Sequence, residues 1–350
     1  MRTEPVRVAV VGVGYWGPNL VRNLIEYEGA EVAYVCDRDP AALARVARRY
    51  PSLRTTTAFD LVLGDDGVDA IAIATPVSTH HRLAGDALRA GKHVLVEKPL
   101  AASAAEALEL IALARQHELV LMPGHTFLYS PPVNLVCDYI AAGELGEIFF
   151  VSTSRVNLGL HQPDVSVAWD LGPHDFSILR YWLGERPTTV NAISRGCIIP
   201  SIPDIAFVNL EFPSGTIAHV ELSWLAPSKL RRTTVVGSRK MVVYDDTSTE
   251  PVRLFDSGVA LRDPQSFGEY RMTYRTGSIV SPRVEPVEPL LLEVGDFVRS
   301  VRTGSNPRSD AGLGLDVVLT IEAAERSLAA GGTPVEVERS PHLLLGARSR

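Results

Sequence analysis

The chain has 350 residues, of which 46% are apolar, and a formal net charge of −7 at pH 7. This length predicts two domains, each with enough apolar residues for a core. The sequence has no basic tract, which disfavours nucleic-acid partners. It has no apolar run of the ~18 residues that a membrane helix needs. The three cysteines are scattered, which disfavours disulfides and metal clusters. We therefore expect a cytoplasmic protein that binds no metal, nucleic acid or membrane.

The first predicted element is a strand that ends in a glycine-rich turn. The apolar run from Val6 to Val11 leads into Gly12-Val13-Gly14-Tyr15-Trp16-Gly17, and a helical pattern follows. Between a strand and a helix, the spacing G-x-G-x-x-G is typical of a dinucleotide-binding loop. Gly12 allows the turn, Gly14 lets a pyrophosphate approach the backbone, and Gly17 lets the helix pack closely. The loop, including Tyr15 and Trp16, is predicted to bind the cofactor.

The second predicted strand ends at Asp37, twenty residues after Gly17. This is where a dinucleotide fold places the carboxylate that binds the ribose hydroxyls, and a 2′-phosphate there would meet a negative charge. NAD is therefore favoured over NADP. Arg38 is also assigned to the cofactor site, because an arginine can stack on adenine or pair with a 2′-phosphate. In the alternative interpretation, Asp37 only begins a turn with Asp39.

Helix and strand signals alternate through the first third of the chain. Helices are expected at 41–50, 78–90 and 103–117, with Ser78 and Ser103 as N-caps, and strands at 69–74, 93–96 and 119–122. This alternation predicts a parallel sheet with helices on both faces. Glu97-Lys98-Pro99 follows one of these strands, at the sheet edge where ligands bind in such folds.

The pattern changes near residue 125. Helices are expected at 131–142, 169–183, 290–302 and 313–330. Strands are expected at 148–156, 188–199, 206–212, 216–224, 232–237, 241–245 and 252–255, and a surface excursion at 257–288. The predicted fold class is α/β: an N-terminal Rossmann domain at residues 1–124 and a C-terminal α+β domain at 125–350 with an open, mostly antiparallel sheet.

Two groups of polar residues are candidates for proton transfer. Lys98 can hydrogen-bond a substrate hydroxyl. If a helix starts near Pro173, Asp170 precedes it and His174 lies in its first turn, so that the histidine can act as a general base with the carboxylate as its partner. The alternative is that Asp170 is a plain N-cap and His174 a packed helix residue.

These residues resemble the Gfo/Idh/MocA oxidoreductase family over nearly the whole chain. The resemblance rests on Val10 through Gly17, Thr75-Pro76 with His80, Glu97-Lys98-Pro99-Leu100, and Asp170 with His174. It implies that Lys98 is the catalytic lysine, that His174 is the acid/base group and that Asp170 is its partner. It also implies a cis peptide bond before Pro99, cofactor contacts from Thr75, Pro76, His80, Glu97 and Lys98, and a homodimer or homotetramer formed through one sheet face.

A narrower resemblance concerns the substrate. Arg155 and Asn157, together with the stretch from Asp164 to Asp170, are similar to the branch that contains UDP-N-acetylglucosamine(uronate) 3-dehydrogenases. An arginine can bind a carboxylate or phosphate through two hydrogen bonds. Arg155, Asn157 and Tyr129 are therefore predicted to contact the substrate, together with Lys98, Asp170 and His174. Alternatively, Arg155 is a solvated residue at a sheet edge.

The resemblance implies an NAD-dependent oxidoreductase that moves a hydride to or from a ring carbon of a sugar, C3 of a nucleotide-linked sugar being favoured. Three alternatives stay open: a free-sugar or inositol dehydrogenase, a glycosidase that works through transient oxidation, and a non-catalytic nucleotide-sensing regulator. Retention of Lys98, Asp170 and His174 argues against the regulator, because a sensor needs no acid/base groups.

Overall fold

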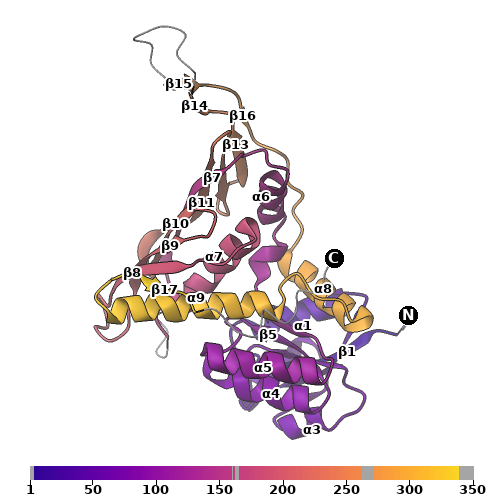
Figure 1. Cartoon of the computed structure of the whole chain (residues 1–350). Helices are drawn as coiled ribbons and strands as arrows, with labels where there is room; N and C mark the ends of the chain where they lie inside the picture. Colours follow the sequence, from indigo (N-terminus) through magenta and orange to yellow (C-terminus); the bar gives the residue numbers. More distant parts are fainter. Residues whose placement is uncertain (1–3, 160, 162–164, 262–271, 339–350) are drawn as a thin grey trace, which may run out of the picture. The chain divides into compact units, whose positions relative to one another are not determined.

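The computed structural model describes residues 4–159, 161, 165–261 and 272–338 (Figure 1). The chain forms two compact units. Among its described residues, unit 1 contains 4–130 and 287–319, and unit 2 contains 131–286 and 320–338 apart from the gaps named above. The division differs from a single boundary after residue 124, because the chain returns to unit 1 over Val287–Leu319.

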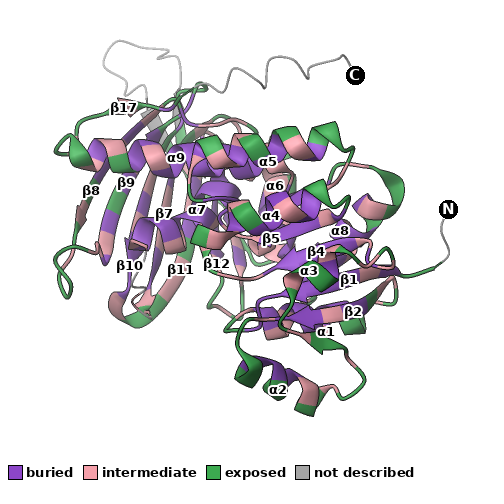
Figure 2. Cartoon of the chain, turned by 90° about the horizontal axis from the view of Figure 1, so that it is seen from below, coloured by how far each residue is buried: buried purple, intermediate pink, exposed green. Residues whose placement is uncertain are grey.

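Unit 1 is built on a six-stranded parallel sheet with the strand order β3-β2-β1-β4-β5-β6, which is the order of a Rossmann fold. The strands β1, β4 and β5 are almost entirely buried (Figure 2), as expected of a sheet covered on both faces. The strands are β1 (Val6–Val11), β2 (Ala30–Cys36), β3 (Thr55–Thr56), β4 (Ala70–Ile73), β5 (His93–Glu97) and β6 (Leu121–Gly124).

Helices connect these strands in the predicted alternation. The helical segments before residue 130 are α1 (Gly17–Glu26), α2 (Pro40–Arg49), α3 (Phe59–Leu63), η1 (Val77–Thr79), α4 (His80–Arg89), α5 (Ala104–Gln116) and η2 (Thr126–Tyr129). Ser103 caps α5 as predicted, because its Oγ accepts a hydrogen bond from the backbone N–H of Glu106 at 3.2 Å. The predicted cap at Ser78 is wrong, since this residue lies inside η1 and α4 starts two residues later.

The returning segment completes unit 1. Helix α8 (Pro289–Thr303) contacts α1, β1 and η2, and α9 (Ala311–Ala329) starts in this unit and ends in unit 2. Arg22 of α1 and Glu288, just before α8, form an ion pair with 2.5 Å between Nη2 and Oε1. The sequence predicted both helices but gave no signal that the chain returns, because a helix pattern does not reveal which sheet the helix covers.

Unit 2 contains a nine-stranded sheet, ordered β16-β13-β12-β11-β7-β10-β9-β8-β17. All neighbours run antiparallel except β7 and β10, which are parallel. The strands are β7 (Ile148–Leu158), β8 (Thr189–Arg195), β9 (Ile205–Glu211), β10 (Ile217–Ser223), β11 (Leu225–Gly237), β12 (Met241–Asp245), β13 (Val252–Phe255), β16 (Ile279–Val280) and β17 (Val335–Glu336). This confirms the predicted α/β class with a mostly antiparallel second sheet.

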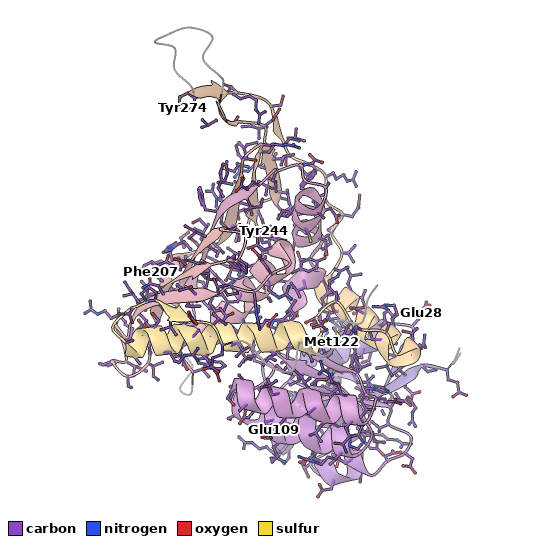
Figure 3. All side chains as sticks on the ribbon, in the orientation of Figure 1. Glu28, Glu109, Met122, Phe207, Tyr244 and Tyr274 are labelled. Carbon is purple, nitrogen blue, oxygen red and sulfur yellow. The ribbon has the colours of Figure 1, made fainter. Side chains whose placement is uncertain are left out.

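The two faces of this sheet differ. Along β10, Ala218, Val220 and Leu222 are fully buried, and helix α7 (Val167–Leu183) contacts this strand, with α6 (Pro131–Ala141) packed against α7. The alternating residues face the other way, and apolar side chains among them are exposed: Ile217 is 54% exposed and Phe207, labelled in Figure 3, is 37% exposed. Among the described residues, the sheet therefore has one packed face and one face that carries exposed apolar side chains.

The region expected as a surface excursion contains short strands in its described parts. β14 (Gly258–Leu261) pairs with β15 (Met272–Arg275) as a separate two-stranded sheet, and β16 joins the edge of the large sheet. The sequence did not predict these strands, because they are short and residues 257–288 are too polar to show the alternation of a strand. Among the described residues, no helix is both long enough and apolar enough to cross a membrane.

Candidate functional site: a dinucleotide loop and an acid/base helix

The glycine loop has the geometry that a dinucleotide requires. Gly12 adopts a φ of +89°, and a Cβ on Gly17 would lie 1.9 Å from the carbonyl oxygen of Gly12, so only glycine fits there. A Cβ on Gly14 would meet nothing within 4 Å, so the backbone there borders open space. The N-terminus of α1 follows directly, and its free N–H groups favour an anion. These features fit the pyrophosphate of NAD or NADP.

Asp37 stands at the end of β2, beside this loop. Its Oδ2 accepts a hydrogen bond from the backbone N–H of Val13 at 2.7 Å, and its Oδ1 accepts one from Asp39 N–H at 2.9 Å. The second contact is the turn expected in the alternative interpretation, but the first ties the carboxylate to the glycine loop. Each oxygen keeps a lone pair that can accept a ribose hydroxyl. Arg38 is exposed next to it.

The turns after β4 and β5 are joined by one histidine. His80 is 1% exposed; its Nε2 lies 2.9 Å from the carbonyl oxygen of Thr75, and its Nδ1 lies 2.9 Å from that of Pro99. Burial lowers the pKa of His80. The imidazole therefore lies between the Thr75-Pro76 turn and the turn that carries Lys98, and its predicted contact with the cofactor stays a prediction. The peptide bond between Lys98 and Pro99 is cis, as the family resemblance implied.

Glu97, His125 and Glu293 form a buried polar cluster next to Lys98. Glu97 is in register with Gly124, and two residues on, Thr126 Oγ1 donates a hydrogen bond to Glu293 Oε2 at 2.7 Å. Burial raises the pKa of Glu97 to about 7, and burial and then the charge of Glu97 raise the pKa of Glu293 well above its usual range. Burial and the positive charge of Lys98 lower the pKa of His125 to about 3. Sequence reasoning missed Glu293, which comes from the returning helix α8.

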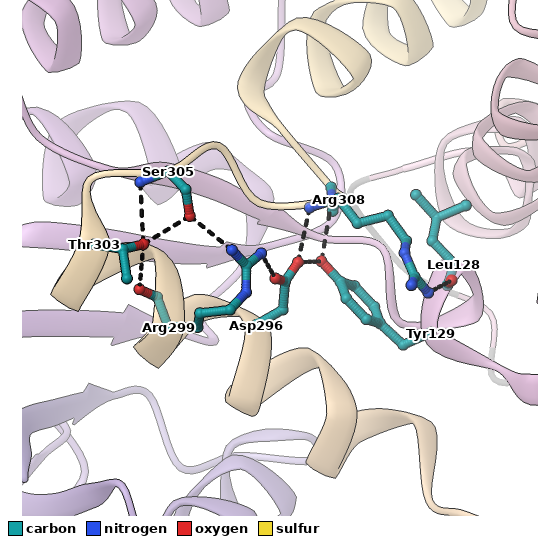
Figure 4. A network of polar contacts seen from close by, with 8 residues as sticks. Leu128, Tyr129, Asp296, Arg299, Thr303, Ser305 and Arg308 are labelled. Atoms are coloured by element: carbon teal, nitrogen blue, oxygen red, sulfur yellow. Dashed lines mark hydrogen bonds and ion pairs between the residues drawn. The ribbon is translucent and has the colours of Figure 1, made fainter.

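Tyr129 has an internal role (Figure 4). It is 2% exposed; its hydroxyl donates a hydrogen bond to Asp296 Oδ2 at 2.8 Å and accepts one from the N–H of Ser309 at 3.1 Å. The guanidinium of Arg308 lies 5.2 Å from the centre of its ring. The side chain therefore connects η2 to α8 and to the segment that follows it, and its predicted contact with the substrate stays a prediction.

In unit 2, Asp170 and His174 lie on one helix. α7 starts at Val167, earlier than the expected start near Pro173, and Pro173 lies inside it. Both side chains are therefore helical and four residues apart, which places them on the same face, with Cβ atoms about 5–6 Å apart. Asp170 occupies the first turn, where the helix dipole favours a carboxylate. The Nε1–H of Trp224 donates a hydrogen bond to Asp170 Oδ2 at 3.1 Å.

The surroundings of Arg155 give it an internal partner, and its contact with a substrate stays a prediction. Its side chain is 4% exposed, and its Nε donates to Asp175 Oδ2 at 2.5 Å. Thr153 Oγ1 donates to the other oxygen of Asp175 at 2.8 Å. Burial opposes the charge on Arg155, but the Asp175 carboxylate keeps the pKa of the guanidinium above its usual value. The arginine fork thus binds a carboxylate of its own unit; Asn157, two residues along β7, is partly exposed.

The structure thus gathers the predicted residues in two sets. In unit 1, the glycine loop, Asp37, the Thr75 turn and the Lys98 turn all follow carboxyl ends of strands in one parallel sheet, where ligands bind in this class of fold. In unit 2, Asp170 and His174 share a helix face.

Comparison with known families gives a match for a segment of each unit. Residues 6–125 match the model of the oxidoreductase family with an NAD-binding Rossmann fold, and residues 133–243 match the GFO/IDH/MocA C-terminal domain. The chain belongs to the Gfo/Idh/MocA oxidoreductase family. This membership places it among NAD(P)-dependent enzymes whose relatives are sugar dehydrogenases and oxidoreductases.

Three relatives show the range within the family. The solved structure of GenD2 from gentamicin A biosynthesis, in complex with NAD, is 28% identical with a TM-score of 0.82, over 96% of this chain and 97% of that chain. The UDP-N-acetylglucosamine 3-dehydrogenase of Acidithiobacillus ferrooxidans is 29% identical over 65% of this chain and 70% of its own length. The D-xylose 1-dehydrogenase (NADP(+)) 2 of Haloferax volcanii is 27% identical over 94% and 99%.

The internal role of Arg155 leads to the first testable prediction. Arg155→Ala leaves the Asp175 carboxylate buried without its charged partner, a change that costs about 3–5 kcal/mol. We expect a large fall in the denaturation midpoint, measured by urea unfolding followed by circular dichroism. Arg231→Ala, which removes a partly exposed ion pair with Asp246, is the matched control and should change stability by about 1 kcal/mol or less. Unchanged stability of Arg155→Ala would contradict the structural role.

Proposed function

We propose that the protein is an NAD-dependent oxidoreductase that transfers a hydride to or from C3 of a nucleotide-linked sugar. The observation that carries this proposal is the pair of Asp170 and His174 on one face of α7, in a chain whose other unit has a dinucleotide loop and a lysine at the sheet edge. A protein that only senses a nucleotide has no use for an acid/base pair held in this way.

The side chains have separate tasks in this reaction. Bound NAD supplies the hydride acceptor for the carbinol carbon, or NADH the donor for the ketone. Lys98 donates a hydrogen bond to the reacting oxygen of the sugar and polarises it. His174 removes the hydroxyl proton during oxidation and returns it during reduction, and Asp170 stabilises the imidazolium that forms. The glycine loop and the N-terminus of α1 would hold the phosphates of the cofactor.

The choice of substrate rests on the relatives and not on Arg155. The name of the Acidithiobacillus relative supports oxidation at C3 of a UDP-linked sugar. The name of the Haloferax relative supports the second candidate, a free-sugar dehydrogenase, on the same fold. We favour the nucleotide-linked sugar because Asn157 and the stretch from Asp164 to Asp170 are similar in sequence to the 3-dehydrogenase branch.

The reaction can be tested with a panel of substrates. UDP- and dTDP-linked hexoses, free pyranoses and inositols are offered with NAD, and with NADH where the ketone exists, and nicotinamide absorbance is followed. We expect the highest kcat/KM with a nucleotide sugar. Lys98→Ala and His174→Ala should each lower kcat at least ~100-fold, the usual scale of acid/base assistance. Arg38→Ala, in the cofactor half, serves as the comparison and should mainly change the KM for cofactor. Faster turnover of free inositol or glucose than of every nucleotide sugar would favour the free-sugar reading instead.

The cofactor preference follows from Asp37. A 2′-phosphate next to this carboxylate would meet a repulsion on the order of a few kcal/mol at an effective dielectric of ~20. We therefore expect tighter binding of NADH than of NADPH by calorimetry, and a loss of at least ~10-fold in this preference for Asp37→Asn. Asp39→Asn removes a neighbouring charge and keeps the cap of α2, so it should leave the preference almost unchanged. Equal binding of the two cofactors by the unaltered protein would mean that Arg38 outweighs Asp37.

We further propose that the protein is a homodimer or homotetramer that assembles through the face of the nine-stranded sheet that carries exposed apolar side chains. The exposed side chains of Ile193, Phe207 and Ile217 support this, since apolar residues clustered on one surface favour a protein partner. Ile217→Glu should shift the sedimentation coefficient to that of a smaller species. Leu61→Glu, at a residue 50% exposed in unit 1, is the control and should leave it unchanged. A monomeric unaltered protein at micromolar concentration would contradict the proposal.

A further inference from the structure

We propose that Trp224 is a positioning residue of the acid/base pair: its indole N–H fixes the Asp170 carboxylate and thereby the orientation of His174. This inference rests on the proposed function of Asp170 and His174. It concerns a residue that no motif of the sequence singled out and that lies fifty-four positions away from Asp170 along the chain.

The indole is held on several sides. Trp224 directly follows β10 and is 1% exposed. Its backbone N–H donates to the carbonyl of Asp204 at 3.0 Å, and its carbonyl accepts from Gly159 N–H at 2.9 Å. A Cβ on Gly159 would come within 2.6 Å of the indole, so the backbone of Gly159, directly after β7, lies against the ring. A ring held this firmly has a fixed direction for its single N–H.

That N–H is the donor to Asp170. An indole N–H has no acceptor lone pair and does not titrate, so it can only donate, and at 3.1 Å it donates to Oδ2. Asp170 sits in the first turn of a helix that contacts β10. One carboxylate oxygen is therefore bonded to a rigid group on the sheet, and the carboxylate cannot rotate freely about its side-chain torsions. His174, one turn along the same face, meets a carboxylate of fixed orientation.

The same ring has a second polar neighbour. The imidazole of His161 lies 5.3 Å from the Trp224 ring, centre to centre, and its Nε2 is 3.6 Å from Asp204 Oδ2. Asp204 is fully buried and also accepts hydrogen bonds from the backbone N–H groups of Cys197 and Ile198 at 2.8 to 3.0 Å. Asp204 thus binds the backbone of Trp224 through its carbonyl and the turn at Cys197 and Ile198 through its carboxylate.

Trp224→Phe tests the role because it removes the N–H and keeps an aromatic ring. Loss of a hydrogen bond to a charged group should lower kcat roughly 10- to 150-fold with little change in the KM for NAD. The solvent deuterium isotope effect on kcat should rise, because proton transfer becomes slower relative to the other steps. Trp182→Phe is the matched control. The buried indole of Trp182 lies on α7, the helix of Asp170 and His174, and donates to the carbonyl oxygen of Val133 at 2.8 Å; loss of this N–H should change kcat less than about twofold.

A double-variant cycle separates positioning from general packing. If the indole acts through Asp170, Trp224→Phe should lower kcat less than about twofold in an Asp170→Asn background, since groups that act as a unit are not additive. A further tenfold loss in that background would overturn the inference. If Trp224→Phe does not fold, 3-benzothienylalanine introduced at position 224 by amber suppression removes the N–H from a ring of the same shape, and the same cycle applies.

A readout without turnover keeps this inference distinct from the proposed function. The indole N–H proton of Trp224, assigned by its disappearance in Trp224→Phe, should shift upfield in Asp170→Asn because its acceptor loses its charge. An unchanged signal overturns the inference whatever the substrate is. If the unaltered protein turned over none of the sugars while the indole N–H signal shifted in Asp170→Asn, only the proposed function would be contradicted.

Discussion

The close approach of two glycines fixes the geometry of unit 1. Because Gly17 lies against the carbonyl of Gly12, helix α1 can begin close to the end of β1, after a loop of five residues, and its N-terminus lies at the edge of the parallel sheet. The carboxylate of Asp37 then binds the N–H of Val13 and ties the neighbouring strand to the same loop. A larger side chain at position 17 would move the helix away from the sheet, and with it the backbone groups that face the phosphates.

Features encoded in adjacent residues were predictable from the sequence. The glycine spacing, the capping residue Ser103 and the strand and helix alternation of the first third all have local physical causes, and the structure confirms them. The return of α8 to unit 1 and the placement of Glu293 beside Glu97 depend on packing between residues nearly two hundred positions apart. No local periodicity carries that information, so these features could not be predicted.

Helix α7 shows why residue type alone does not identify a site. Asp170 and Asp175 are five positions apart on this helix, and both are carboxylates with a nearby donor. Asp175 is bound by Arg155 and Thr153 in the interior, whereas Asp170 lies in the first turn, one turn before His174. The sequence alone is equally compatible with an Arg155 that binds a substrate anion. In the folded chain Arg155 is buried and pairs with Asp175, because a desolvated guanidinium requires a carboxylate partner.

In the buried cluster next to Lys98, Glu97 and His125 change the number of protons that they bind when the chain folds. Glu97 binds a proton more tightly in the folded chain, with its pKa raised from 4.5 to about 7, so its contribution to stability decreases as pH rises from 4.5 to 7. His125 binds a proton less tightly, with its pKa lowered from 6.5 to about 3, so its contribution decreases as pH falls from 6.5 to 3. Between about pH 4.5 and 6.5 the two slopes have opposite signs. Folding then leaves the number of protons on Glu97 and His125 together nearly constant, so the stability that this pair contributes changes little when the pH falls within this range.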